Sequence, residues 1–208
     1  MSGLFITFEG PEGAGKTTQM KLLHDFLLQN QIPCTVVREP GGTIIGDKIR
    51  SILLNPLYTE MTSTTEILLY AASRAQLVEE KIVPALEQGH VVLCDRYIDS
   101  SIAYQCYGGR GEKNEVVQVN QLATHHLLPK RTYLLDLTIK QGQMRLEKRG
   151  MSKDRMELKD ASFHERVRKG YLELSKANEE RFLIIHGEKT IEEVYSEILC
   201  DFKQLFRV

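Results

Sequence analysis

A glycine-rich segment near the start of the chain constrains the fold more than any other feature. Residues Gly10–Thr17 have the sequence GPEGAGKT, which matches the pattern G-x-x-x-x-G-K-[ST]. The segment follows a short apolar run, Leu4–Phe8, and precedes a helical pattern over Lys16–Leu28. This order of strand, loop and helix starts an alternation that continues along the whole chain.

Further short apolar runs follow, each bounded by turn-forming or charged residues. We expect strands at Cys34–Val37, Val91–Cys94, Thr132–Leu135 and Phe182–Ile185, and helices at Ile44–Leu54 and at Thr65–Leu86, the latter interrupted near Pro84. The runs are nearly continuous in apolar residues, as expected of strands covered on both faces. The sequence therefore predicts an α/β fold, a parallel sheet with helices on both faces, in one domain over residues 1–208.

Composition excludes several other classes of protein. The 208 residues are 42% hydrophobic, and 27 Lys+Arg balance 28 Asp+Glu to a net charge of −1. This argues against a disordered chain, a nucleic-acid coat and a binder of anionic membranes. No run approaches the roughly 20 apolar residues of a membrane span. The four cysteines are far apart and no secretory signal is visible, so we expect a cytoplasmic protein with no nucleic-acid or membrane partner.

The glycine-rich segment is suited to phosphate binding. Its glycines let backbone N–H groups surround phosphate oxygens, and the positive end of the following helix adds to that field. Lys16 would reach the β- and γ-phosphates, and the Thr17 hydroxyl would ligate Mg²⁺. We predict that a nucleoside triphosphate binds to Gly10, Pro11, Glu12, Gly13, Ala14, Gly15, Lys16, Thr17 and Thr18.

Asp95 is a second candidate ligand for the metal. It follows the apolar run Val91–Cys94, as an acid at the carboxyl end of a buried strand does in a Walker B site; the alternative is a helix N-cap. The phosphate loop does not by itself name the reaction. The Asp-x-x-Gly and Asn-Lys-x-Asp motifs of switch GTPases occur nowhere in the sequence, which counts against a nucleotide-dependent switch.

Polar clusters occur where loops leave the predicted strands. They are Arg38–Gly42, Asp95–Ser101 and Tyr104–Gln105, and a fourth, Ala71–Arg74, lies within a predicted helix. Open α/β sheets bind ligands at the carboxyl ends of their strands. Arginines can bind phosphate bidentately, and Arg and Gln can recognise the edge of a base. Any one arginine could instead form a surface ion pair, but several together predict a site for a second, phosphorylated substrate.

These segments resemble the thymidylate kinases of the bacterial type. The resemblance rests on the phosphate loop, Arg38–Gly42, Thr65–Arg74 and above all Asp95–Gln105, which contains Asp-Arg-Tyr-x-x-Ser-Ser-x-x-Tyr-Gln. It extends through Asp154-Arg155 to the final helix. It implies the architecture of a P-loop nucleoside monophosphate kinase, a homodimer, and Mg²⁺-dependent transfer of the γ-phosphoryl group of ATP to dTMP, giving dTDP and ADP.

The resemblance also implies how the acceptor phosphate is bound. Arg96, together with Arg50, would contact the dTMP phosphate. Glu39 would lie near the metal and this phosphate, and Glu12 would approach the 3′-hydroxyl or the metal shell. The attacking phosphate oxygen is already mostly ionised at neutral pH, because its second pKa is about 6. We therefore expect no general base; positioning and charge neutralisation carry the catalysis.

The resemblance implies a binding site for the base and the sugar as well. Tyr70 would stack on thymine, and Arg74 would donate a hydrogen bond to its O4. Gln105, with Ser101, would recognise the N3 side of the base. Tyr104 would crowd the 2′ position of the sugar and so favour deoxyribose.

The remaining positive charge is expected from a lid. Some thymidylate kinases have a basic residue in the phosphate loop where this chain has Gly13. The resemblance implies a mobile lid at about residues 142–160, in which Arg155, and next Arg149, would contact the transferred phosphoryl group. The charged stretch Arg145–Arg168 could instead be a solvated helix face.

Two other functions stay open from the sequence. The first is a kinase for another nucleotide or for a nucleoside. A nucleoside acceptor has a neutral hydroxyl group and would need a carboxylate base beside it, such as Glu39. The second is the nucleotide-dependent switch. The helix predicted at Thr65–Leu86 could form part of the dimer surface or could simply pack in the core.

Overall fold

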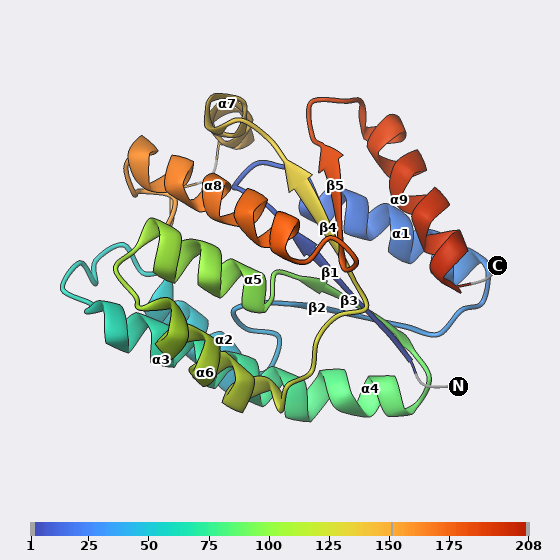
Figure 1. Ribbon diagram of the computed structural model, residues 1–208, viewed down its shortest axis with the longest axis horizontal. Coiled ribbons are helices and arrows are strands. Elements are labelled where there is room, and N and C mark those ends of the chain that lie inside the picture. The colour runs from blue at the N-terminus through green and yellow to red at the C-terminus, as the bar shows by residue number, and fades with distance from the viewer. Residues whose placement is uncertain (1–2, 151, 207–208) are drawn as a thin grey trace.

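The structure is a computed structural model that describes residues 3–150 and 152–206 (Figure 1). Five strands form one parallel sheet in the order β2-β3-β1-β4-β5. They are β1 (Leu4–Glu9), β2 (Cys34–Arg38), β3 (Val91–Asp95), β4 (Arg131–Asp136) and β5 (Phe182–His186). All five predicted strands are confirmed. Each extends past its apolar run by a polar residue at the carboxyl end, so the strands present polar side chains at that edge.

Helices cover both faces of the sheet (Figure 1). On one face, α1 (Lys16–Gln29) packs beside α9 (Ile191–Phe206), and their apolar residues share a core with β1, β3, β4 and β5. The other face carries α3 (Ser63–Leu77), α4 (Val83–Glu87), α5 (Ile98–Ser101), the π-helical segment η2 (Ile102–Gly108) and α8 (Ala161–Ala177). The predicted α/β architecture is thus confirmed. None of the helices in the described part of the chain is long and apolar enough to cross a membrane.

The predicted interruption near Pro84 has a different form. The helix does not stop there, because α3 continues through a π-helical turn, η1 (Val78–Ile82), into α4, where Pro84 lies in the first turn. Proline lacks an N–H and its ring collides with the carbonyl group four residues earlier in a regular helix. The wider π-helical turn ends at Ile82, two residues before Pro84, so the chain adapts to the proline without ending the helix. Leu77, Val78 and Ile82 of this helix are buried in the core.

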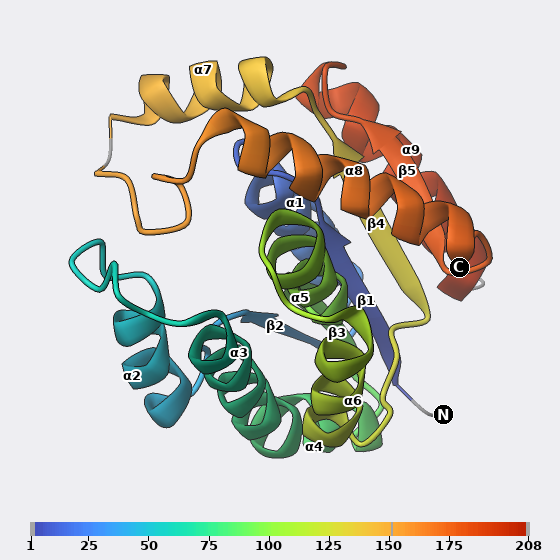
Figure 2. The same ribbon diagram turned by 60° about the vertical axis from the view of Figure 1, so that its left-hand side comes forward.

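The charged stretch from Arg145 to Arg168 is not one solvated helix face. Helix α7 (Ile139–Arg149) ends at Gly150, whose φ of +67° is the left-handed conformation common after a helix. Helix α8 begins after Asp160, whose side chain accepts a hydrogen bond from the Phe163 N–H at 2.7 Å. Residues 152–160 have no helix or strand, and they lie opposite the end of α2 (Ile44–Leu53) (Figure 2).

The carboxyl ends of the three central strands lie side by side. Asp95 of β3 pairs in register with Phe8 of β1 on one side and with Arg38 of β2 on the other. The phosphate loop, the turn after β2 and the Arg96 segment therefore begin at neighbouring points of one edge. Parallel α/β sheets bind their ligands at this edge.

Candidate active site

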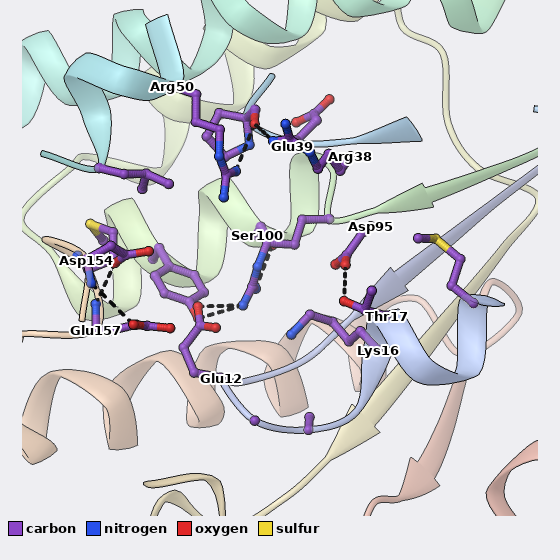
Figure 3. Close-up of a pocket in the computed structure, with 18 of the residues that line it drawn as sticks. Glu12, Lys16, Thr17, Arg38, Glu39, Arg50, Asp95, Ser100, Asp154 and Glu157 are labelled. Atoms are coloured by element: carbon purple, nitrogen blue, oxygen red, sulfur yellow. Dashed lines mark hydrogen bonds and ion pairs between the residues drawn. The ribbon is translucent and has the colours of Figure 1, made fainter. Parts of the chain in front are cut away.

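A cavity of about 870 Å³ opens at this edge of the sheet. Its walls come from the phosphate loop, the turn after β2, helices α2 and α3, η2, and the segment that follows α7. Figure 3 shows Lys16, Thr17 and Asp95 at one end of the cavity and Asp154 and Glu157 at the other. The volume is within the range of small-molecule sites.

The phosphate loop has the form that its sequence predicts. Helix α1 begins at Lys16, so its positive end points into the loop. The Lys16 side chain is buried, and its Nζ donates hydrogen bonds to the carbonyl oxygens of Gly10 at 3.1 Å and Pro11 at 2.9 Å. Burial and the nearby Arg96 guanidinium lower the pKa of Lys16. The ammonium group is thus held inside the loop, where it can meet phosphate oxygens.

Gly13 lies directly against helix α7. Its φ is +74°, and a Cβ added to it would lie 2.6 Å from the carbonyl oxygen of Gly142. A side chain at this position would collide with α7, which explains why this loop has no basic residue there. Arg145 of α7 instead donates to the carbonyl oxygens of Gly13 at 3.4 Å and Gly187 at 2.8 Å, and it lines the cavity. The sequence patterns did not single out Arg145, because it lies within a uniformly charged stretch.

We expect Gly13→Ala to lower the free energy of unfolding by about 1–3 kcal/mol. The new Cβ would collide with the backbone of Gly142, and alanine is strained at the left-handed φ of position 13. Thermal unfolding without nucleotide measures this loss. Gly15→Ala is the matched control: Gly15 has φ +93°, but its added Cβ meets no atom within 4 Å. Equal losses in both variants would contradict a specific contact between Gly13 and α7.

Thr17 and Asp95, the two predicted metal ligands, lie side by side next to the loop. The Thr17 hydroxyl donates to Asp95 Oδ2 at 2.9 Å (Figure 3). Asp95 is not the N-cap of the next helix, since Tyr97 has that position in α5, which corrects the alternative left open by the sequence. Mg²⁺ at nucleotide sites takes one or two protein oxygens and completes its shell with phosphates and water. These two side chains fit such a metal.

Arg96 is the centre of a hydrogen-bonded network. It has a positive φ of +70°, and its Nη2 pairs with Glu12 Oε1 at 2.7 Å. The same nitrogen donates to Tyr104 Oη at 3.1 Å, and Nη1 donates to Tyr171 Oη at 2.9 Å. Although burial opposes ionisation of Glu12, the Arg96 guanidinium lowers the pKa of this carboxyl group to about 2. The structure therefore brings Glu12, Arg96 and Tyr104 together, and adds Tyr171 of α8, which no sequence motif indicated.

Arg74 and Glu39 form a buried ion pair at the wall of the cavity. Arg74 is 1% exposed, and its Nε donates to Glu39 Oε2 at 2.7 Å. Its two terminal nitrogens contact Glu39, Ser101, Asn120 and the Tyr97 carbonyl oxygen. Nε, both Nη1 hydrogens and one Nη2 hydrogen thus donate to protein acceptors, and Nη2 also pairs with Glu39, so the predicted bond to thymine O4 would have to compete with these contacts. Asn120, from α6 (Lys113–Thr124), was not predicted because α6 is distant in sequence.

The other predicted acceptor residues also line the cavity. Arg50 of α2 donates from Nη1 to the Pro40 carbonyl oxygen at 2.9 Å. Tyr70 and Gln105 line the same cavity, as do Ser101 and Tyr104. Gln105 is almost fully buried, and its Nε2 donates to Glu66 Oε1 at 3.0 Å. Glu66 lies within the Thr65–Arg74 segment, but no function was predicted for it.

Arg155 lies in a different environment from the predicted one. Its side chain is 7% exposed, its Nε donates to the Leu53 carbonyl oxygen at 2.7 Å, and its Nη2 pairs with Glu66 Oε2 at 2.6 Å. Arg155 is not among the described residues that line the cavity. In this conformation it joins the segment after α7 to the end of α2. The side chain of Arg149 falls outside the described part of the chain, so its predicted contact stays a prediction.

One cavity at the edge of a parallel α/β sheet thus contains the glycine-rich loop, the Thr17–Asp95 pair and several arginines. This combination is typical of a nucleotide-dependent phosphotransferase. The family model described as thymidylate kinase matches residues 8–198. The thymidylate kinase of Exiguobacterium sibiricum is 50% identical, over 97% of this chain and 94% of its own length. That of Geobacillus thermodenitrificans is 45% identical, over 96% and 89%.

A solved structure of a thymidylate kinase is similar to this chain as well. The crystal structure of thymidylate kinase from Ehrlichia chaffeensis superimposes with a TM-score of 0.77 at 31% identity, covering 97% of this chain and 99% of that one. The chain belongs to the thymidylate kinase family, as the sequence resemblance predicted.

Proposed function

We infer that this chain transfers the γ-phosphoryl group of ATP to dTMP, giving dTDP and ADP. The observation that carries this inference is one cavity shared by a phosphate loop and an arginine-lined acceptor pocket, in a member of the thymidylate kinase family. The reaction needs two anionic nucleotides held end to end, with their negative charge neutralised. The residues of the cavity supply both requirements.

The donor would occupy the phosphate loop. Backbone N–H groups between Gly10 and Thr18 would hold its phosphates, and Lys16 would contact the β- and γ-phosphates. Thr17 and Asp95 would hold Mg²⁺, which when bound neutralises charge on the phosphates. The short distance between their oxygens supports this assignment.

The acceptor phosphate would lie between Arg96 and Arg50. Glu12 and Tyr171 hold the guanidinium of Arg96 in place, so little side-chain entropy is lost when a phosphate binds. The buried carboxylate of Glu39 has one oxygen, Oε1, with no hydrogen-bond partner among the described residues, which suits a donor or a metal-bound water from the substrate side.

The base and sugar would lie beyond this phosphate. We propose that Tyr70 stacks on thymine, that Arg74 and Ser101 border O4 and the N3 side, that Gln105 accepts from N3–H, and that Tyr104 excludes a 2′-hydroxyl. Each of these side chains lines the cavity, which supports the set as a whole.

We propose residues 142–160 as the lid. Arg145 connects α7 to the phosphate loop and, with Arg149, would supply the positive charge that Gly13 lacks. The sequence also suggested Arg155 for the transferred phosphoryl group. Its ion pair with Glu66 and its bond to Leu53 support a different assignment, the anchor of the lid on α2 and α3.

A homodimer in the cytoplasm completes the proposal. Leu68 of α3 and Leu122 of α6 are exposed on two helices that pack against each other, which supports these helices as the dimer surface. Sedimentation of the pure protein gives its oligomeric state.

A coupled ADP-release assay tests the activity. With ATP as donor, we expect dTMP to have the highest kcat/KM in a panel of nucleoside monophosphates that includes dUMP, with thymidine inactive. A nucleoside kinase would use thymidine better than dTMP, and that result would overturn the proposal. The carboxylate that such an enzyme would need, Glu39, is already paired with Arg74, which favours the phosphate acceptor.

A further inference from the structure

Glu66 contacts the acceptor site without lining it. It lies in the first turn of α3, and its two carboxylate oxygens have different partners. Oε1 accepts from Gln105 Nε2 at 3.0 Å, and Oε2 pairs with Arg155 Nη2 at 2.6 Å. The three side chains are at most 14% exposed, so the connection is shielded from solvent. Glu66 therefore joins a cavity-lining amide to a buried arginine.

This contact fixes which way the Gln105 amide faces. A side-chain amide has a donor end and an acceptor end, and rotation by half a turn exchanges them. An ionised carboxylate has only acceptors, so Glu66 can bond only the NH₂ end. On the other carboxylate oxygen, Arg155 likewise has only N–H donors to offer, so both oxygens of Glu66 face donors. The carbonyl oxygen of Gln105 is thereby left for the cavity.

An acceptor at this point distinguishes between pyrimidine bases. Thymine and uracil carry a hydrogen on N3, whereas N3 of cytosine is an acceptor with no hydrogen. A buried site whose acceptor faces another acceptor loses its hydrogen bond and leaves both atoms desolvated. A fixed Gln105 oxygen would therefore accept the first two bases and reject the third.

We propose that Glu66 is a positioning residue for base selection: by holding the amide of Gln105, it makes the enzyme select acceptors that carry N3–H. This rests on the proposed function, in which Gln105 faces N3 of the base. In the wild-type protein the Glu66 carboxylate excludes the Gln105 orientation in which the amide oxygen faces Glu66. A side-chain amide at position 66 would permit both orientations of Gln105.

The test is Glu66→Gln, with kcat and KM measured for dTMP and dUMP, and with dCMP measured as substrate and as competitive inhibitor of dTMP phosphorylation. The amide introduced at position 66 can accept or donate, so Gln105 can turn and offer its NH₂ group to cytosine. We expect the preference for dTMP over dCMP to fall by about tenfold or more, the size of one buried hydrogen bond to a substrate. The preference for dTMP over dUMP, which have the same N3–H, should stay within about twofold.

Arg155→Met is the matched control. It breaks the same ion pair as Glu66→Gln but leaves a carboxylate facing Gln105. Whatever its effect on kcat, the preference for dTMP over dCMP should stay at the wild-type value. Thermal unfolding of both variants shows how much stability the shared ion pair contributes.

Three results would overturn the proposal: an unchanged dCMP preference in Glu66→Gln, an equal shift for dCMP and dUMP, or the same shift in Arg155→Met. These results concern only Glu66, provided that the wild-type protein makes dTDP. A wild-type protein that makes no dTDP would instead refute the proposed function.

Discussion

Lys16→Met should lower kcat by about 10²–10³-fold, the loss expected when one preorganised donor to the developing charge is removed. The Lys16 ammonium is buried among backbone carbonyls of the phosphate loop, where water screens its charge poorly. Methionine has a similar shape but no charge. Because the proposed function places Lys16 against the phosphates of ATP and not against dTMP, KM for dTMP should change by less than about threefold. Coupled ADP release at saturating ATP measures both constants.

Lys21→Met is the control for this variant. Lys21 lies in the same helix, α1, but its side chain is exposed. Its removal should leave kcat unchanged, and the two variants carry the same change in net charge. Thermal unfolding accompanies the kinetics, because Lys16→Met also removes the Lys16 hydrogen bonds to the carbonyl oxygens of Gly10 and Pro11. The Gly10 oxygen keeps its hydrogen bond from Arg96 Nη1 at 3.1 Å. A folded Lys16→Met protein with wild-type kcat would refute the role of this side chain.

The strands and the phosphate loop were predictable because their signals are local. A short apolar run between turn-forming residues indicates a buried strand, and all five strands appear where such runs occur. Glycines followed by Lys16 and Thr17 define the loop within eight residues. The position of Asp95 at the carboxyl end of β3 was predictable too, since Asp95 directly follows an apolar run.

The networks that hold the site residues could not be predicted, because they depend on contacts between distant segments. Arg74 meets Asn120 only because α6 packs against α3, and nothing in either segment indicates that packing. The absence of a side chain at Gly13 is explained by Gly142, more than a hundred residues later. Arg155 shows the same limit: its sequence suggested a mobile lid, and its partners are in α2 and α3.

Arg74→Met should lower the free energy of unfolding by about 3–5 kcal/mol near neutral pH, the usual loss when one partner of a buried ion pair is removed. In a chain of this length that corresponds to roughly 10 °C in Tm. Glu39 would stay buried, at 5% exposure, with no positive charge beside it. Thermal unfolding measures the loss.

The loss should depend on pH with a definite sign. Burial raises the pKa of Glu39, and the Arg74 guanidinium opposes that rise. Without Arg74 the pKa of Glu39 in the folded protein rises further above its value in the unfolded chain. A protonated Glu39 is tolerated in the folded state at low pH, and the free energy of unfolding of the variant falls as pH increases through the pKa of Glu39 in the folded protein. The variant should therefore lose more stability at about pH 8 than at about pH 5. The double variant Arg74→Met with Glu39→Gln has no buried charge and should recover much of the loss at the higher pH. Equal deficits at both pH values, with no recovery in the double variant, would show that the lost hydrogen bonds to Ser101 and Asn120 matter and the charge of Glu39 does not.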